Sequence, residues 1–126
     1  MLADRKIWYA ANKDRINAKQ REYRRTNPDA RRGYRLKSEF GITLEDYDRM
    51  VAAQGGKCAI CLLPPPGTGR NTKRLHIDHD HDTGEIRGLL CHACNTSLGQ
   101  LGEDHERMQR MIDYVTKHNG RRNASP

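Results

Sequence analysis

Two short stretches decide the fold of this chain: Cys58-Ala-Ile-Cys61 and Cys91-His-Ala-Cys94. They are matched Cys-x-x-Cys pairs, and the sequence of 126 residues has no cysteine outside them. Each pair can present two thiolates to one ion, so that both pairs together complete a tetrahedral zinc shell with no open position. The pattern therefore predicts a closed, structural zinc site.

Other interpretations of the cysteines are four ordinary buried thiols, which would not require matched pairs, and a redox dithiol, which would require a βαβ setting. His92 lies between two of the expected ligands, and we interpret it as a bystander because four thiolates already fill the shell. A compact region of about 65 residues is marginally stable by burial alone. Zinc is therefore expected to decide whether this region folds.

The 29 residues between the two cysteine pairs are too many for a simple zinc ribbon. They contain the run His76-Ile-Asp78-His79-Asp-His81, which holds three of the chain's six histidines. In a strand, the first, third and fifth members of this run would share one face, and a bend near residues 79–80 would relax that division. The run is the candidate for chemistry beyond zinc binding.

Phosphodiester hydrolysis needs a base that activates water, a cation that stabilises the developing charge, and a means of holding the phosphate in line. His79 offers the base, because neutral imidazole titrates near physiological pH. Asp78 offers a hard oxygen ligand for Mg²⁺ or Mn²⁺, and Asn95, at an expected helix start, can supply a second. The alternatives are a solvated loop or an adventitious metal site, or a further structural metal site for which no fourth convergent ligand is evident.

The N-terminal part of the chain is expected to be helical. Residues 3–26 carry good helix formers without a sustained apolar face, and such a helix needs a partner. Asn27 before proline is pushed away from helical geometry, whereas Pro28 is well placed to open a second helix that runs to about Phe40. Gly41 is the expected stop.

A short amphipathic helix is predicted after Thr43, its N-cap, and ends at the glycines of residues 55–56. Strands are expected over residues 75–78 and 85–90, followed by a helix opened by Asn95. A last helix is expected from Glu103 to about His118, with an apolar face made of Met108, Met111, Ile112 and Val115.

Basic residues are concentrated at the N-terminus. Residues 1–37 hold 12 Lys and Arg against 4 Asp and Glu, so residues 38–126 hold the remaining 11 against 12. A local net charge of +8 favours a polyanionic partner, and a solvated charged face would not explain why the rest of the chain is nearly neutral. The residues expected to contact DNA are Arg15, Lys19, Arg21, Arg24, Arg25, Arg31, Arg32 and Arg35, together with Arg87 in the second strand.

No stretch approaches the roughly 20 apolar residues of a membrane span, and the first residues lack the apolar core of a secretion signal. The expectation is a cytoplasmic protein, in the bacterial host if phage-encoded. The expected division is a basic helical arm over residues 1–40, a compact zinc-bound domain over residues 41–120 and a flexible tail over residues 121–126.

The run His-Ile-Asp-His-Asp-His, followed by Gly-Glu-Ile-Arg-Gly-Leu-Leu-Cys-x-x-Cys-Asn, closely resembles the phage recombination endonuclease VII branch of the His-Asn-His nucleases. The resemblance implies an α+β, ββα-metal fold in which the four cysteines bind zinc and Asp78 and Asn95 bind the catalytic ion. His79 would be the general base, His81 would assist at the phosphate or the metal, and His76 would support the hairpin.

By this resemblance the chain would be a DNA endonuclease that leaves 5′-phosphate and 3′-hydroxyl ends. Duplex and branched DNA remain open as substrates, as do nicking, homing-type and junction-resolving activities, and a homodimer. The sequence departs from the branch at Leu98, where a junction-resolving member carries an acidic residue. The alternative from another class is a non-catalytic zinc-dependent DNA-binding module.

Overall fold

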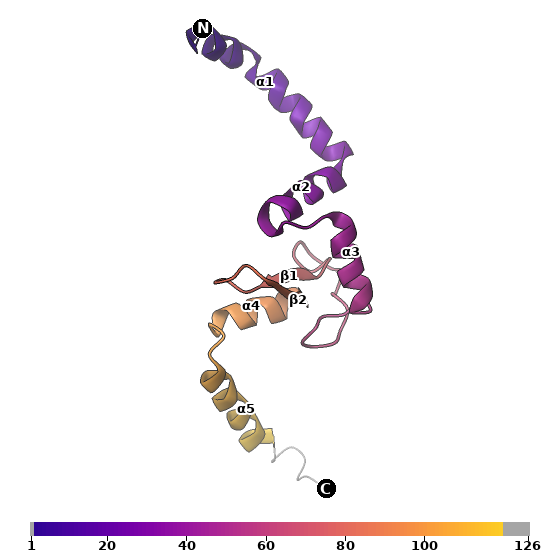
Figure 1. Ribbon diagram of the computed structural model, residues 1–126, viewed down its shortest axis with the longest axis vertical. Coiled ribbons are helices and arrows are strands. Elements are labelled where there is room, and N and C mark those ends of the chain that lie inside the picture. The colour runs from indigo at the N-terminus through magenta and orange to yellow at the C-terminus, as the bar shows by residue number, and fades with distance from the viewer. Residues whose placement is uncertain (1, 120–126) are drawn as a thin grey trace. The chain divides into compact units, whose positions relative to one another are not determined.

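The computed structural model describes residues 2–119, and the chain divides into two compact units, Met1–Arg49 and Met50–Pro126 (Figure 1). The tail expected over residues 121–126 lies outside the described residues. The α+β class predicted from the sequence is confirmed. In chain order the elements are α1 (Leu2–Thr26), α2 (Pro28–Phe40), α3 (Leu44–Ala53), β1 (His76–His79), β2 (Ile86–Leu90), α4 (His92–Gln100) and α5 (His105–Asn119).

The bounds of α1 and α2 follow the local signals in the sequence. Asn27 leaves the helical region, with φ −129° and ψ 64°, and Pro28 opens α2. Gly41 ends α2 in the left-handed conformation at φ 70°. Its N–H bonds to the carbonyl of Lys37 at 3.0 Å, and the N–H of Ile42 bonds to the carbonyl of Leu36 at 3.4 Å. A left-handed residue with such bonds satisfies carbonyls that the helix end leaves unpaired, so glycine is the favoured residue here.

The first unit has a very small apolar core. Leu36 of α2 and Tyr47 of α3 are its buried side chains among the described residues, at 7% and 6% exposure. Gly33 lets α2 approach α3, since a Cβ there would lie 3.4 Å from Cδ1 of Leu44. In contrast, α1 has no buried side chain along its described length, as its lack of an apolar face predicts.

The start of α3 is a reciprocal capping box. The N–H of Thr43 bonds to Oδ2 of Asp46 at 2.9 Å, and the N–H of Asp46 bonds to Oγ1 of Thr43 at 3.1 Å. Two donors that the first turn would leave unpaired are therefore satisfied by side chains. The predicted N-cap at Thr43 is confirmed.

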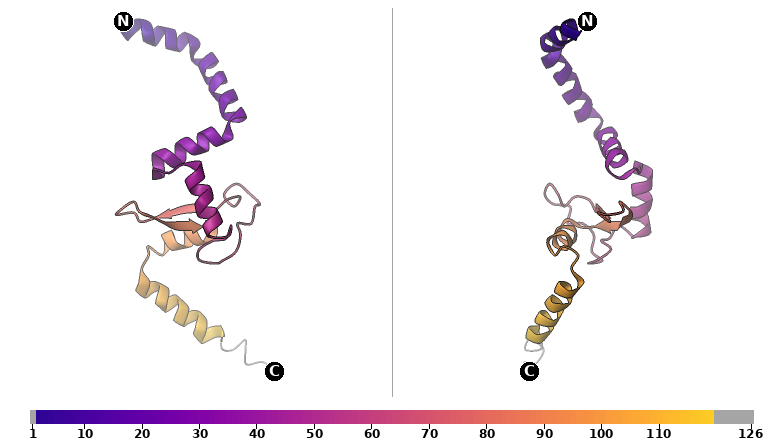
Figure 2. Two further views of the ribbon diagram at one scale, coloured as in Figure 1. Left: turned by 45° about the vertical axis from the view of Figure 1, so that its right-hand side comes forward. Right: turned by 60° about the vertical axis from the view of Figure 1, so that its left-hand side comes forward.

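The second unit is built on an antiparallel hairpin of β1 and β2, with α4 against β1 (Figure 2). Asp78 pairs with Gly88, but the next residue, His79, pairs with Ile86, so that Arg87 is an extra residue in β2. This bulge lies next to the bend expected at residues 79–80. A bulge of this kind bends the strand and redirects a side chain.

The turn between the strands is held by Asp80. Its backbone N–H bonds to the carbonyl of Glu85 at 2.8 Å, and its Oδ1 accepts the N–H groups of Asp82 and Thr83 at 2.8 and 2.9 Å. These hydrogen bonds lower the pKa of the Asp80 carboxyl, because they favour its charged form. Asp80 therefore shapes the hairpin turn.

The core of the second unit contains two cysteines. Its buried side chains in the described residues are Leu75, Leu89, Leu90, Cys58 and Cys91. Leu89, at 0% exposure, and Cys58, at 1%, are the most deeply buried. A core this small buries little apolar surface, which agrees with the expectation that a metal supplies part of the stability.

The predicted starts of the last two helices were wrong. The Sγ of Cys91 accepts the N–H of Cys94 and caps α4, so the helix begins at His92 and Asn95 lies within its first turn. At α5, Oδ1 of Asp104 accepts the N–H of Arg107 at 2.9 Å. This cap starts the helix at His105 and leaves Glu103 in the preceding turn, at φ 57°.

The apolar face predicted for α5 is present and mostly exposed, with Met108 half-buried. Met111, Ile112 and Val115 are 50%, 57% and 51% exposed, and α5 has no buried residue. Among the described helices, none combines the length and the apolar character of a membrane span.

Candidate active site and metal centre

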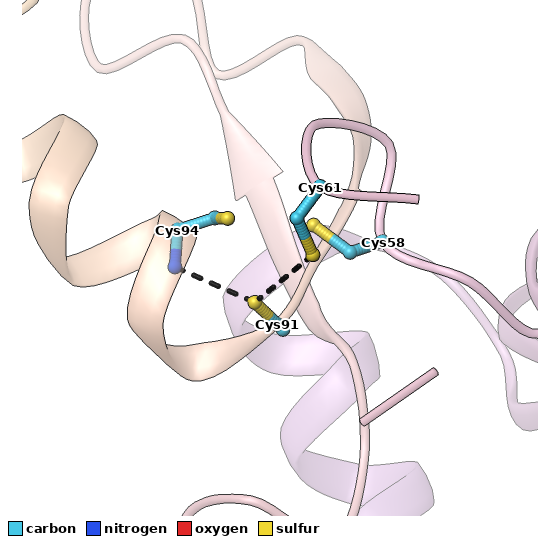
Figure 3. Close-up of side chains that lie close together, drawn as sticks. All are labelled: Cys58, Cys61, Cys91 and Cys94. Carbon is cyan, nitrogen blue, oxygen red and sulfur yellow. Dashed lines mark hydrogen bonds between the residues drawn. The ribbon is translucent and has the colours of Figure 1, made fainter. Parts of the chain in front are cut away.

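Four cysteine sulfurs converge at the junction of the hairpin and α4 (Figure 3). Cys58 and Cys61 come from the loop after α3, and Cys91 and Cys94 from the start of α4. All four sulfurs lie within 4.8 Å of one another, and those of Cys61 and Cys91 are 3.9 Å apart. Tetrahedral zinc with Zn–S bonds of about 2.3 Å separates its sulfurs by roughly 3.8 Å, so the cluster fits a zinc ion.

The surroundings of the cluster favour the thiolate at Cys58 and oppose it at Cys94. The N–H of Ile60 points to Sγ of Cys58 at 3.4 Å, and the N–H of Cys94 to Sγ of Cys91 at 3.5 Å. Burial raises the pKa of Cys58, but hydrogen bonds from Cys91, Cys61 and Ile60 outweigh it and bring the pKa to about 6. Burial and the neighbouring thiols raise the pKa of Cys94 to about 12. Deprotonating all four cysteines therefore costs free energy, because their negative charges lie close together. A bound dication offsets this electrostatic repulsion.

The candidate hydrolytic residues lie on adjoining elements. Asp78 and His79 belong to β1, and Asn95 lies in the first turn of α4, which is packed against β1. All three side chains are half-buried. The carboxylate and amide oxygens of Asp78 and Asn95 are the donor types that Mg²⁺ and Mn²⁺ prefer. Among residues 2–119, no group of three or more His, Cys, Asp or Glu other than the cysteine cluster gathers around one point.

The remaining histidines of the run have different surroundings. The ring of His81 lies near that of His79, with centroids 4.7 Å apart. His76 makes a hydrogen bond of 2.7 Å between its Nε2 and the carbonyl of Asn71, and its ring lies 5.5 Å from that of His92. His81 is thus next to the candidate base, whereas His76 connects the hairpin to the preceding loop and to α4.

Arg87 and Glu103 are part of this site in a way that the sequence did not indicate. Arg87 was expected to contact DNA, yet its guanidinium bonds to the carboxylates of both Asp78 and Glu103. The hydrogen bonds from Arg87 lower the pKa of Glu103, and the two carboxylates raise the pKa of Arg87. Glu103 is distant from the hairpin in sequence and belongs to no motif, so no local pattern could have identified it.

Apart from Arg87 in β2, the basic side chains predicted to bind DNA lie on α1 and α2. Arg15, Lys19, Arg21, Arg24 and Arg31 are exposed. The other three have neighbours within the unit: Arg25 pairs with Glu22 at 2.7 Å, Arg35 pairs with Glu39 at 3.0 Å, and Arg32 lies 4.3 Å above the ring of Tyr47.

The sequence pattern of the recombination endonuclease VII family matches residues 33–117, which include the cysteine cluster, the hairpin and Asn95. The chain belongs to the recombination endonuclease VII family. The match begins within α2, so that α1 lies outside it.

Similar proteins occur in mycobacteriophages. The chain is 45% identical over 84 residues to the Gene 59 protein of Mycobacterium phage D29, covering 66% of this chain and 48% of that protein. It is 38% identical over 96 residues to the Gene 59 protein of Mycobacterium phage L5, covering 75% and 56%. The chain thus spans about half the length of these relatives.

Among solved structures, the chain is similar to the ββα-Me type II restriction endonuclease Hpy99I, with 28% identity and a TM-score of 0.43. This similarity covers 65% of the present chain and 46% of that one.

Proposed function

We propose that this endonuclease VII family member is a divalent-metal-dependent DNA endonuclease that hydrolyses phosphodiester bonds. The supporting observation is the placement of Asp78 and His79 on β1 against α4, which carries Asn95. The cysteine cluster holds the start of that helix, and we propose that it binds a structural zinc ion. The zinc site thereby supports the arrangement of hairpin and helix on which the chemistry depends.

In this proposal Asp78 and Asn95 would hold one Mg²⁺ or Mn²⁺ ion, which would supply stabilisation of negative charge on the phosphate and on the leaving oxygen. His79 accepts a proton from water, and the resulting hydroxide attacks the phosphorus. The bond from phosphorus to the 3′ oxygen breaks, and that oxygen takes a proton from solvent water, leaving a 5′-phosphate and a 3′-hydroxyl. His81, next to His79, assists at the phosphate or the metal, and His76 supports the hairpin.

We further propose that residues 1–40 form a DNA-binding arm and that residues 41–120 form the nuclease domain. The arm's contacts would come from Arg15, Lys19, Arg21, Arg24, Arg25, Arg31, Arg32 and Arg35. Exposed basic side chains on a helix with no buried face can follow a phosphate backbone without disturbing a core. The substrate is duplex or branched DNA, and a homodimer is compatible with the exposed apolar face of α5.

A plasmid assay tests the activity. Supercoiled plasmid with Mg²⁺ or Mn²⁺ should be nicked by the zinc-loaded wild type and by His105→Ala, an exposed histidine at the start of α5. His79→Ala should leave the plasmid intact while shifting it as strongly as wild type in a gel. If folded, zinc-loaded wild type binds DNA but never cuts it, the protein is a zinc-dependent DNA-binding module instead.

A panel of linear, nicked, flapped and four-way DNA substrates then distinguishes the proposed substrate classes. Faster cleavage of the four-way or flapped DNA would assign the protein to branched DNA. Cleavage of linear duplex at the same rate as of four-way and flapped DNA would assign the protein to nicking or homing-type activity.

A further inference from the structure

Arg87 is held in a fork between two carboxylates from different elements. Its Nε and Nη2 bond to Oδ2 and Oδ1 of Asp78 at 2.8 and 3.0 Å. Its Nη1 and Nη2 bond to Oε2 and Oε1 of Glu103, both at 2.8 Å. Paired bonds of this kind restrict both the position and the plane of a carboxylate, which a single contact does not.

The β-bulge makes this arrangement possible. In a regular antiparallel ladder Arg87 would stand opposite His79, on the face of the hairpin away from Asp78. Because Arg87 is the extra residue of the bulge, its side chain is free of that alternation and reaches Asp78. The backbone irregularity thus has a specific result at the proposed metal ligand.

Glu103 reaches Arg87 from the turn between α4 and α5. Its φ of 57° is uncommon for a residue other than glycine and persists only where surrounding contacts sustain it. The side chains of Arg87 and Glu103 are 33% and 39% exposed, whereas that of Asp78 is 14% exposed. The most protected member of the group is therefore the proposed metal ligand.

We propose that Arg87 and Glu103 are positioning residues for Asp78, an inference that rests on the proposed function. Arg87 orients the Asp78 carboxylate, while each carboxylate oxygen keeps a second lone pair for the ion. Arg87 alone would neutralise Asp78 and repel a dication. Glu103 anchors the guanidinium and offsets its charge, so that the group of three side chains keeps a net negative charge and still attracts the ion.

The test measures Mn²⁺ binding to the full-length, zinc-loaded protein by electron paramagnetic resonance, beside plasmid-nicking kinetics. Glu103→Gln should weaken Mn²⁺ binding about 10-fold and lower kcat with little change in KM, because partners of a metal ligand commonly act on this scale. Glu106→Gln, a matched change at an exposed glutamate of α5, should behave as wild type. Zinc content and Tm should be the same in all three proteins.

Two further variants separate positioning from other roles. In an Arg87→Gln background, Glu103→Gln should change Mn²⁺ affinity by less than about twofold, since it acts through a side chain already removed. Arg87→Lys keeps the charge but not the fork, and it should weaken Mn²⁺ binding as well. An undiminished effect of Glu103→Gln without Arg87 would make Glu103 a direct ligand and overturn the proposal.

The remaining outcomes distinguish this inference from the proposed function. If wild type binds no Mn²⁺, the proposed metal site fails, and the inference fails with it. If wild type binds Mn²⁺ and Glu103→Gln binds it equally well, only the inference fails. A fall in Tm that accounts for the lost affinity would show a merely structural role and would also overturn it.

Discussion

The side chain of Gln54, just after α3, makes hydrogen bonds to the edge of β2 that a neighbouring strand would otherwise make. Its Nε2 donates to the carbonyls of Leu89 and Lys57 at 2.9 and 2.8 Å, and its Oε1 accepts the N–H of Leu89 at 2.9 Å. Leu89 is fully buried, so its N–H has no access to water. One side chain thus satisfies a buried backbone group and links the end of α3 to the strand that leads into Cys91.

We predict that Gln54→Ala lowers the free energy of unfolding by about 1–3 kcal/mol, because it leaves the buried N–H of Leu89 without a partner. Urea denaturation of the zinc-loaded protein measures the change. Gln109→Ala removes an exposed glutamine that bonds to Asp113 on its own helix, and it should cost less than about 0.5 kcal/mol. Equal effects of the two changes would contradict this role for Gln54.

Three described helices begin with side-chain caps of different kinds: the Thr43 and Asp46 pair at α3, a cysteine thiol at α4 and Asp104 at α5. Each occupies backbone N–H groups that the helix cannot pair internally. At α4 the capping atom is also a sulfur of the cysteine cluster. The start of the helix that carries Asn95 is therefore tied to the cluster.

The cap of α3 predicts a specific pH dependence. Hydrogen bonds from the backbone and side chain of Thr43 lower the pKa of Asp46 below its ordinary value of 3.8. Because the folded pKa is the lower one, the stabilisation is fully present above pH 3.8 and is lost as pH falls through the folded pKa.

The difference in stability between wild type and Asp46→Asn should therefore be constant near neutral pH and shrink below pH 3.8. Thermal melts followed by circular dichroism, from neutral pH to pH 3, measure it. Asp48→Asn, at an exposed position of the same helix, provides the control and should show no such trend. A wild-type advantage that persists at the acid end would contradict the role of the Asp46 carboxylate.

At the scale of the whole molecule, the two units depend on different kinds of support. The unit Met50–Pro126 combines a few buried leucines with four converging cysteines. The unit Met1–Arg49 has one long helix with no buried residue and many exposed basic side chains. We expect a bound metal ion to stabilise the unit Met50–Pro126, and we expect DNA phosphates to bind the basic side chains of the unit Met1–Arg49.

Cys91→Ser should therefore unfold the hairpin region, because structural zinc contributes on the order of 10–16 kcal/mol of apparent binding energy. Zinc content by atomic absorption and amide dispersion by NMR report the outcome. His92→Ala, between two of the cysteines, should retain one zinc per chain. A folded Cys91→Ser protein without zinc would refute the structural role of the cluster.

The basic arm predicts how DNA binding depends on salt. Replacing Arg15, Lys19 and Arg21 by Gln should reduce the slope of log affinity against log salt by about 3, at roughly 0.9 per phosphate contact. Fluorescence anisotropy with a duplex oligonucleotide measures this slope. The same change of Arg107, Arg110 and Lys117 on α5 should alter it far less. If the slope falls less for the arm variant than for the α5 variant, the main DNA contact does not lie on the arm.

The sequence alone determined the features that short-range chemistry encodes. Pro28 and Gly41 delimit α2 and Thr43 caps α3, because each effect acts within a few residues. The two cysteine pairs are distant in sequence, but their matched spacing predicted that they converge, because one tetrahedral zinc ion takes four thiolates. The same reasoning predicted the ββα order of hairpin and helix. It also chose Asp78, His79 and Asn95, although their catalytic roles remain predictions.

Only the tertiary structure decided what depends on contacts between distant segments. The cysteine cap moved the start of α4 to His92, and a bulge in β2 directs the side chain of Arg87 toward Asp78. Glu103 joined the site from a turn 16 residues beyond Arg87. Neither the bulge nor the left-handed turn has a signature in residue type alone, since each is sustained by contacts that form only when the chain folds.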